Sequence, residues 1–333
     1  MKWKSLLQNA IRRVITLVQT PVTRLLINLL VLGFCIFYLV DNFQGIVSAT
    51  QQASINFWLL SAAWLITWIV TWLGGVSWWL LLSGLNQKID WLEGWQAHFK
   101  PALAKYIPGF IWQYVGKGVL TGALGVPARV IGALLIWEFF QAIWLGVGVG
   151  LLFFPQAEIM GWELPPGTQI ALRGIGVVML LALLAMILSA PKLLSRSSVS
   201  GFELRKKYFY LSTAVVTFGW IMLGLALWMT LASFQRIEFN SYPFAIFSLT
   251  MSLVGGILVL PVPNGLGVRE GIMIYLLSPV ITQQVALLVS VVSRLQLISG
   301  EIFCVILFEI TRHVRSKRRS RRPEEVNTSN GLL

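Results

Sequence analysis

Long apolar runs constrain this chain more than any other feature. One of them, "WLITWIVTWLGGVSWWLLL" (residues 64–82), contains no charged residue. About 20 apolar residues in a helix are enough to cross the roughly 30 Å hydrocarbon core of a bilayer. Only 12% of the 333 residues are charged, about half of what soluble domains carry. The sequence therefore predicts an all-α polytopic membrane protein.

The net charge of +13 has a membrane explanation as well. Lysines and arginines cluster at the ends of the apolar runs, as the positive-inside rule requires. No nucleic-acid recognition fold is visible, so nucleic acid is not an expected partner. Cys35, Cys304, His98 and His313 are too far apart in sequence for a disulfide framework or a metal motif. We expect no cofactor.

Six runs are predicted to span the membrane completely, and the basic segments orient them. Cations precede the first run and also occur in residues 191–207 and in the tail "RHVRSKRRSRR". By the positive-inside rule they predict that both termini are cytoplasmic, in a bacterial-type inner membrane. We predict that residues 1–24 form a basic amphipathic helix on the membrane surface, and that residues 312–333 form a disordered basic tail. The predicted spans are residues 25–40, 57–82, 129–154, 168–190, 208–233 and 282–311.

Two further apolar segments, residues 91–127 and 242–279, must return to the side from which they start. The return arm 268–278 has about 11 residues, or about 16 Å at helical rise, which is too short to cross the core. Both segments are therefore predicted to be re-entrant hairpins. An alternative with eight full spans extends the second return arm into a crossing, and needs a turn near residues 289–293, where no turn residues occur.

The order span, span, hairpin, span occurs twice. Residues 25–154 form the first unit and residues 168–311 form the second, within a membrane domain of residues 25–311. Because each unit crosses three times, the second unit must be inverted. Inverted repeats with broken helices that meet near the midplane are typical of transporters.

The predicted hairpin tips are the candidate binding elements. A helix that restarts inside the membrane presents its N-terminal N–H groups, which bind anions, and two lysines flank the first tip. A lipid phosphate head group is the expected guest. The candidate head-group residues are Lys105, Tyr106, Pro108, Gly109 and Lys117 around the first tip, and Pro263, Asn264, Gly265, Gly267, Arg269 and Glu270 around the second.

Charged residues inside apolar runs are costly and usually face a cavity or a partner. Glu138, Arg294 and Glu301 are of this kind. A structural pair, such as Glu138 with Arg294, and a role in ion coupling both remain open for them. For Arg269, on the glycine-rich tip, a functional role is the favoured interpretation.

Two motifs together resemble a known family. "KYIPGFIWQYVGK" (105–117) and "LPVPNGLGVREG" (260–271) are similar to the paired motifs of the flippase-like membrane family, which includes the transmembrane region of lysylphosphatidylglycerol synthases, the multiple peptide resistance factors. "SRLQLISGE" (293–301) fits the final helix of that pattern. Asn264 stands where the pattern more often has glycine. The resemblance implies translocation or handling of polar lipids, and because only residues 312–333 follow the membrane part, we expect no lysyl transfer.

The leading hypothesis is a lipid translocator that holds an anionic or polar head group between the two tips, with anionic phospholipids or lipid-linked head groups as partners. The alternative is a non-transporting module that binds lipid or assists a membrane glycosyltransferase or lipid-modifying enzyme. An intramembrane enzyme is less favoured, because only Glu138, Glu270 or Glu301 could act as its acid or base. We expect no catalytic residue.

Overall fold

The computed structural model describes residues 55–106, 112–155, 161, 163–165, 167–196, 204–259 and 265–320, and contains no strand within them. The predicted surface helix 1–24, the first span 25–40 and the tip residues Pro108, Gly109, Pro263 and Asn264 lie outside the described residues. The helices are α4 (Phe57–Gly84), α5 (Trp91–Ala102), η1 (Leu103–Tyr106), α6 (Trp112–Ala123), α7 (Ala128–Leu152), α8 (Thr168–Arg196), α9 (Lys206–Phe234), η3 (Phe239–Ser241), α10 (Tyr242–Leu258), α11 (Val268–Leu277) and α12 (Gln283–Ser320).

Six segments in this part of the chain are long and apolar enough to cross a membrane. Five of them lie in α4, α7, α8, α9 and α12 and confirm five predicted spans. The sixth, Phe239–Leu258, contains α10, which the sequence assigned to the descending arm of a hairpin. The 17 residues of α10 extend about 25 Å at helical rise, slightly less than the hydrocarbon thickness.

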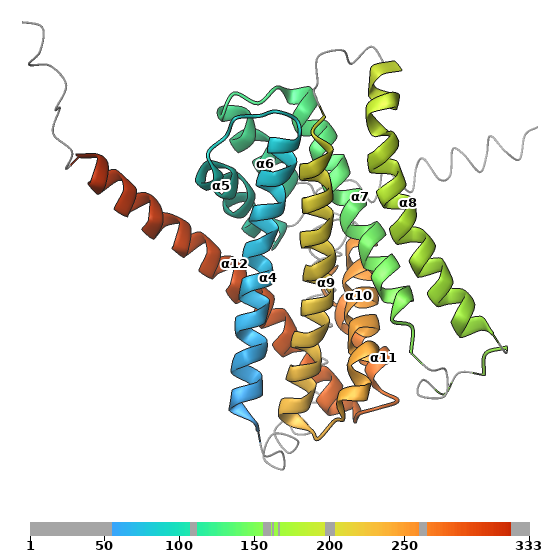
Figure 1. The fold of residues 1–333 in the computed structure, drawn as a ribbon. Helices are drawn as coiled ribbons and strands as arrows, with labels where there is room; N and C mark the ends of the chain where they lie inside the picture. Colours follow the sequence, from blue (N-terminus) through green and yellow to red (C-terminus); the bar gives the residue numbers. More distant parts are fainter. Residues whose placement is uncertain are drawn as a thin grey trace, which may run out of the picture.

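The end of α12 corrects one prediction. The helix continues to Ser320, so the expected disordered tail does not begin at residue 312. Lysine and arginine are good helix formers, and no glycine or proline interrupts this part of the chain before Pro323. In Figure 1, α12 crosses the bundle at a steep angle and its C-terminal part extends beyond it.

The centre of the bundle is the pair α4 and α9, which pack along much of their length (Figure 1). Ser77 of α4 and Ser212 of α9 share a hydrogen bond of 2.8 Å inside this interface. Helices α5 and α12 pack on α4, while α10 and α7 pack on α9. Small residues permit the closest approaches: a Cβ on Gly224 of α9 would lie 2.8 Å from the Cα of Ile246 in α10.

The bundle contains two pairs of shorter helices, and within each pair the two helices pack against each other. Helices α5 and α6 form the first pair and α10 and α11 the second. In the first pair, a Cβ on Gly116 would lie 2.8 Å from the Cβ of Pro101. In the second pair, Gly265 adopts a φ of +61° and its backbone touches that of Gly256. A side chain in place of hydrogen at these glycines would push the paired helices apart.

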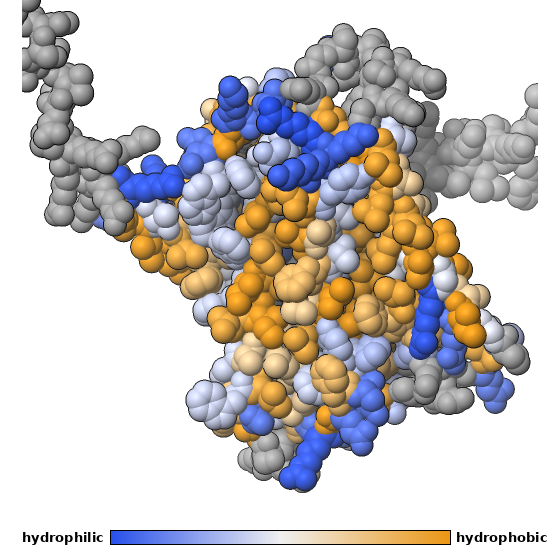
Figure 2. Space-filling view, viewed as in Figure 1, coloured by the Kyte–Doolittle hydropathy of each residue, from blue (hydrophilic) through white to orange (hydrophobic). Residues whose placement is uncertain are grey.

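The surface shows how the molecule meets its surroundings. Figure 2 shows a broad apolar band across the middle of this face, with hydrophilic residues above and below it. Large apolar side chains of the membrane-length helices are exposed, including Ile136 of α7 at 72% and Ile170 of α8 at 78%. Exposed apolar surface of this extent is expected where lipid is the solvent.

Cations gather at one end of the bundle, where α4 ends and where α7 and α9 begin. The connection is tight there, because the N–H of Arg205 donates to the carbonyl oxygen of Gly84 at 2.8 Å. The cations at this end are Lys88, Arg129, Arg205, Lys206 and Lys207. The opposite ends of α9 and α8 carry only Arg236 and Arg173, with Glu238 and Glu163 nearby.

Candidate functional site

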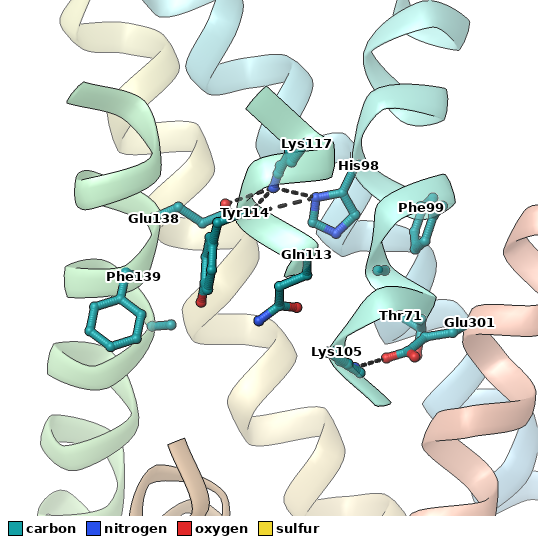
Figure 3. A pocket seen from close by; sticks show the side chains of 12 residues that line it. Thr71, His98, Phe99, Lys105, Gln113, Tyr114, Lys117, Glu138, Phe139 and Glu301 are labelled. Atoms are coloured by element: carbon teal, nitrogen blue, oxygen red, sulfur yellow. Dashed lines mark hydrogen bonds and ion pairs between the residues drawn. The ribbon is translucent and has the colours of Figure 1, made fainter. Parts of the chain in front are cut away.

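A polar cavity of about 220 Å³ lies among α4, α5, η1, α6, α7 and α12 (Figure 3). It is unusual for a membrane helix bundle because five of its lining side chains are ionisable residues of types Lys, Glu and His. The lining residues are Thr71, His98, Phe99, Ala102, Lys105, Gln113, Tyr114, Lys117, Glu138, Phe139, Ala142 and Glu301.

Lys117 is the centre of the charged cluster at one side of this cavity. Its Nζ donates to both carboxylate oxygens of Glu138 at 2.6 Å and lies 2.8 Å from Nδ1 of His98. The ammonium also lies 3.8 Å from the ring centroid of Trp78, a cation–π contact. Only 5% of Lys117 is exposed. Burial of an ammonium at this depth requires such partners, because an isolated buried charge is very costly.

His98 accepts a hydrogen bond from the Lys117 ammonium in this arrangement. An ammonium has three donors and no acceptor, so Nδ1 of His98 must carry a lone pair. A neutral imidazole then has its proton on Nε2, which faces Gly74 of α4: a Cβ on Gly74 would lie 3.3 Å from that nitrogen. The contact between α5 and α4 therefore fixes the ring beside Lys117.

A second ion pair closes the other side of the cavity. Lys105 of η1, which follows α5, forms a salt bridge with Glu301 of α12. In this pair the glutamate is the buried member, with 8% of its side chain exposed against 20% for Lys105. In the Lys117–Glu138 pair the lysine is the buried member, with 6% exposed against 24% for Glu138. Lys105 and Glu138 are thus the more exposed members of the two ion pairs in the cavity lining.

The second pair of short helices holds its charges in packed surroundings. Glu270 of α11 accepts from the N–H of Gly267 at 2.7 Å and forms a salt bridge with Arg294 of α12. Arg269 is 3% exposed, and its Nη2 donates to Oγ of Ser293 at 3.2 Å. None of these residues lines the cavity.

The structure thus divides the predicted site residues into two groups. Lys105, Lys117, Glu138 and Glu301 come together around one cavity. Gly265, Gly267, Arg269, Glu270 and Arg294 lie together at α11 and α12. Tyr106 is the last residue of η1. The suggested pairing of Glu138 with Arg294 is wrong, because each has its own partner on the short helix that precedes it in sequence.

Four polar lining residues were not singled out from the sequence. Gln113 and Tyr114 precede Lys117 by four and three residues on α6, so helical spacing from the lysine predicts that they share its face. His98 and Thr71 give no comparable signal, because they reach the cavity from other helices through tertiary packing. A lone histidine at an apolar helix does not by itself indicate a site.

A search of protein-family models and of curated proteins finds no match to this chain. The class of protein is therefore defined by the fold itself. Helices that are long and apolar enough to cross a membrane make it a multi-pass α-helical membrane protein. Its distinguishing feature is a charged cavity beside the short helices α5 and α6.

Proposed function

We propose that this protein is a flippase-like lipid translocator, which holds an anionic or polar lipid head group in the cavity among α5, α6, α7 and α12. The observation that carries this proposal is the cavity itself, with two lysines and two glutamates in its lining. Charged side chains inside membrane proteins usually line substrate or ion pathways. With about 220 Å³, the cavity is smaller than typical pockets for whole drug-sized ligands, so it suits a head group whose acyl chains stay in the bilayer.

The distribution of cations supports a cytoplasmic location of this cavity. The basic end of the bundle is the end at which α4 leads into α5 and at which α6 leads into α7. By the positive-inside rule this end faces the cytoplasm, and both termini then do so as well. A bacterial-type inner membrane fits this orientation. Lipid head groups would enter from the inner leaflet.

The lengths of α5, α6 and α11 support two re-entrant hairpins, the second with a longer first arm in α10. Helices α5 and α6 have 12 residues each and extend about 18 Å at helical rise, well below the roughly 30 Å core. Helix α11, with 10 residues, extends about 15 Å. A segment that descends and returns in such short arms places its tip within the membrane, where polar backbone must face protein or a water-filled cavity.

The packing pattern supports an inverted repeat. In an inverted repeat α4 would correspond to α9, α5 to α10, α6 to α11 and α7 to α12, and each contact in one half should have a counterpart in the other. The contacts of α4 with α5, α7 and α12 correspond to the contacts of α9 with α10, α12 and α7, respectively. In the same way, the contacts of α5 with α6 and α12 become those of α10 with α11 and α7, and α6 with α7 becomes α11 with α12. Each of these contacts is present, and the central pair α4 and α9 maps onto itself.

Residue spacing agrees with this exchange. Helix α12 starts 155 residues after α7 (283 − 128 = 155). The same interval relates Gly271 to Gly116 (271 − 116 = 155) and Gln296 to Gln141 (296 − 141 = 155). In both halves an ion pair joins the returning short helix to the span that follows it: Lys117 with Glu138 and Glu270 with Arg294. Two similar halves of opposite orientation provide the alternating access of a transporter.

The similarity of residues 105–117 and 260–271 to the flippase-like family points to the same function. In this proposal Lys105 contacts the head group from the first hairpin, and Lys117, which is 5% exposed, holds Glu138 beside the cavity. Arg269 and Glu270 belong to the second half and position α11 against α12. Because Arg269 is bonded to Ser293 and is outside the cavity, we assign it a positioning role.

The test is lipid flux in liposomes that contain the purified protein and either fluorescent phosphatidylglycerol or fluorescent phosphatidylethanolamine. We expect the Lys117→Met/Glu138→Gln double variant to slow translocation by at least about tenfold, since the loss of about 1.4 kcal/mol of binding is tenfold in affinity. The double variant removes both charges together and so avoids an unpaired buried glutamate.

The matched control is Lys100→Gln. Lys100 is a partly exposed lysine of α5 that pairs with Glu309 outside the cavity. We expect its flux to equal that of the wild type. Equal flux in wild-type and double-variant liposomes, or no flux above empty liposomes for the wild type, would refute translocation. A stable complex with a membrane glycosyltransferase together with absent flux would favour the non-transporting alternative.

A further inference from the structure

The cavity's charges define its ligand more narrowly than an anionic or polar head group. Its lining holds two ammonium groups, Lys105 and Lys117, and two carboxylates, Glu138 and Glu301. Each lysine forms a salt bridge with one glutamate, and the protonation pattern at His98 described above adds no charge. The lining is therefore electrically balanced, and a purely anionic guest would leave an uncompensated charge in a poorly solvated place.

The accessible members of the two ion pairs have opposite signs. Glu138 is the more exposed partner of buried Lys117, and Lys105 is the more exposed partner of buried Glu301. In Figure 3 these two pairs lie on different sides of the cavity, with Gln113 and Tyr114 between them. A guest that enters thus meets a carboxylate on one side and an ammonium on the other.

From this geometry we propose that the cavity binds a zwitterionic head group that contains a phosphate and a primary ammonium. The phosphate contacts Lys105 and the ammonium contacts Glu138, so each internal salt bridge gains a second partner of the correct sign. Gln113 and Tyr114 supply hydrogen bonds between the two ends. This inference rests on the proposed function, since it names the class of lipid that the translocator would hold.

Such a guest leaves no net charge buried. A head group with phosphate alone would be attracted by Lys105 and repelled by Glu138 and Glu301. A quaternary ammonium could still be attracted to Glu138, but it has no N–H to donate to that carboxylate. The cavity is therefore expected to prefer a primary ammonium over a trimethylammonium, and either of these over an uncharged alcohol at the same position.

The test is native mass spectrometry of the purified full-length protein with an equimolar mixture of phosphatidylethanolamine, phosphatidylcholine and phosphatidylglycerol of identical acyl chains. We expect the wild type to retain phosphatidylethanolamine over phosphatidylglycerol by about fivefold or more, as one charge-assisted hydrogen bond of about 1 kcal/mol would give. The Glu138→Gln variant should lose this preference. The Lys105→Gln variant should retain less of all three lipids.

Glu309→Gln is the control, because Glu309 pairs with Lys100 outside the cavity, and its retention profile should match that of the wild type. Equal retention of the three lipids by the wild type would overturn the proposal without any variant. So would an unchanged preference in a folded Glu138→Gln protein. Displacement of the retained lipid by equimolar glycerophosphoethanolamine would overturn the lipid assignment and leave a soluble phospho-amine as the guest.

The flux assay separates this inference from the proposed function. Selective retention of phosphatidylethanolamine without flux of any lipid would uphold the ligand class and refute translocation. Flux of phosphatidylglycerol and phosphatidylethanolamine at equal rates, with no selective retention, would uphold translocation and refute the ligand class.

Discussion

Both pairs of short helices, α5 with α6 and α10 with α11, are joined to the following long helix by an ion pair, but the surroundings of the two ion pairs differ. Around α5 and α6, the ion pair of Lys117 with Glu138 borders a cavity and leaves the carboxylate partly accessible. Around α10 and α11, the ion pair of Glu270 with Arg294 is enclosed, with 14% of each side chain exposed. The carboxylate of Glu270 also accepts from the Gly267 N–H. The first pair thus leaves a carboxylate partly accessible beside a cavity, while the second holds its charges between packed helices.

The sign of the charges reverses between the halves. Helix α6 carries the cation and α11 carries the anion, and the helix that follows each of them, α7 or α12, carries the opposite charge. An ion pair holds the two helices together whichever of them carries the cation, so exchange of the two charges preserves its role in packing. Binding of a particular guest does not survive it, because a phosphate or an ammonium distinguishes lysine from glutamate. The difference therefore indicates that the second pair is structural.

The largest expected effect comes from the backbone contact that closes the second pair. Gly265 has a φ of +61°, and a Cβ there would lie 2.7 Å from the carbonyl oxygen of Gly256. Gly265→Ala should lower the free energy of unfolding by about 3 kcal/mol, through strain at positive φ and overlap with fixed backbone. Gly271→Ala is the control, since a Cβ there meets nothing within 4 Å. Thermal unfolding in detergent measures both, and equal midpoints would contradict the closed contact.

The second effect tests the pair at the cavity. Lys117→Met removes the lysine partner of Glu138, whose carboxylate lies 3.6 Å from Nδ1 of His98, and should cost about 2 kcal/mol. Removing one partner of a fully buried pair costs more than this, but Glu138 keeps some solvent contact. The double variant Lys117→Met/Glu138→Gln should recover most of that loss, because no buried charge remains unpaired. Thermal unfolding midpoints of the single and double variants in detergent measure this recovery. A double variant less stable than the single one would show that the pair itself holds the fold.

Sequence patterns predicted the elements of this fold better than their partners. Apolar run length fixed five spans to within a few residues, since a helix must match the bilayer. Breaks such as "YIPGF" marked where short helices meet. The partners of Glu138 and Arg294 depend on which helix faces contact each other in the folded bundle. The sequence does not show these contacts, and the pairing of Glu138 with Arg294 that it suggested is wrong. His98 was missed for the same reason, because its contact with Lys117 joins α5 to α6.

The third effect addresses the enclosed pair in the second half. The double variant Glu270→Gln/Arg294→Met should lower the free energy of unfolding by about 1 kcal/mol, since glutamine can still accept from Gly267. Among the described residues, Nη2 of Arg294 is buried without a hydrogen-bond partner, so its removal relieves part of this cost. Lipid retention by native mass spectrometry should stay within about twofold of the wild type, as for sites that share no partners. A tenfold loss of retention would mean that both halves bind lipid.

The smallest effect concerns a surface contact that joins the two halves. Arg315 of α12 donates to Asp90 at 2.7 Å, with 48% and 45% of the two side chains exposed, and it lies 5.4 Å from the ring centroid of Trp91. Arg315→Gln should cost less than about 1 kcal/mol, as exposed ion pairs do, and the loss should shrink in high salt. Asp90→Ala should cost more, because Asp90 also caps α5 through the Leu92 N–H. The comparison is thermal unfolding at two salt concentrations. If Arg315→Gln proved the more damaging change, the contact between α5 and α12 would depend on this arginine, and the helix cap would be secondary.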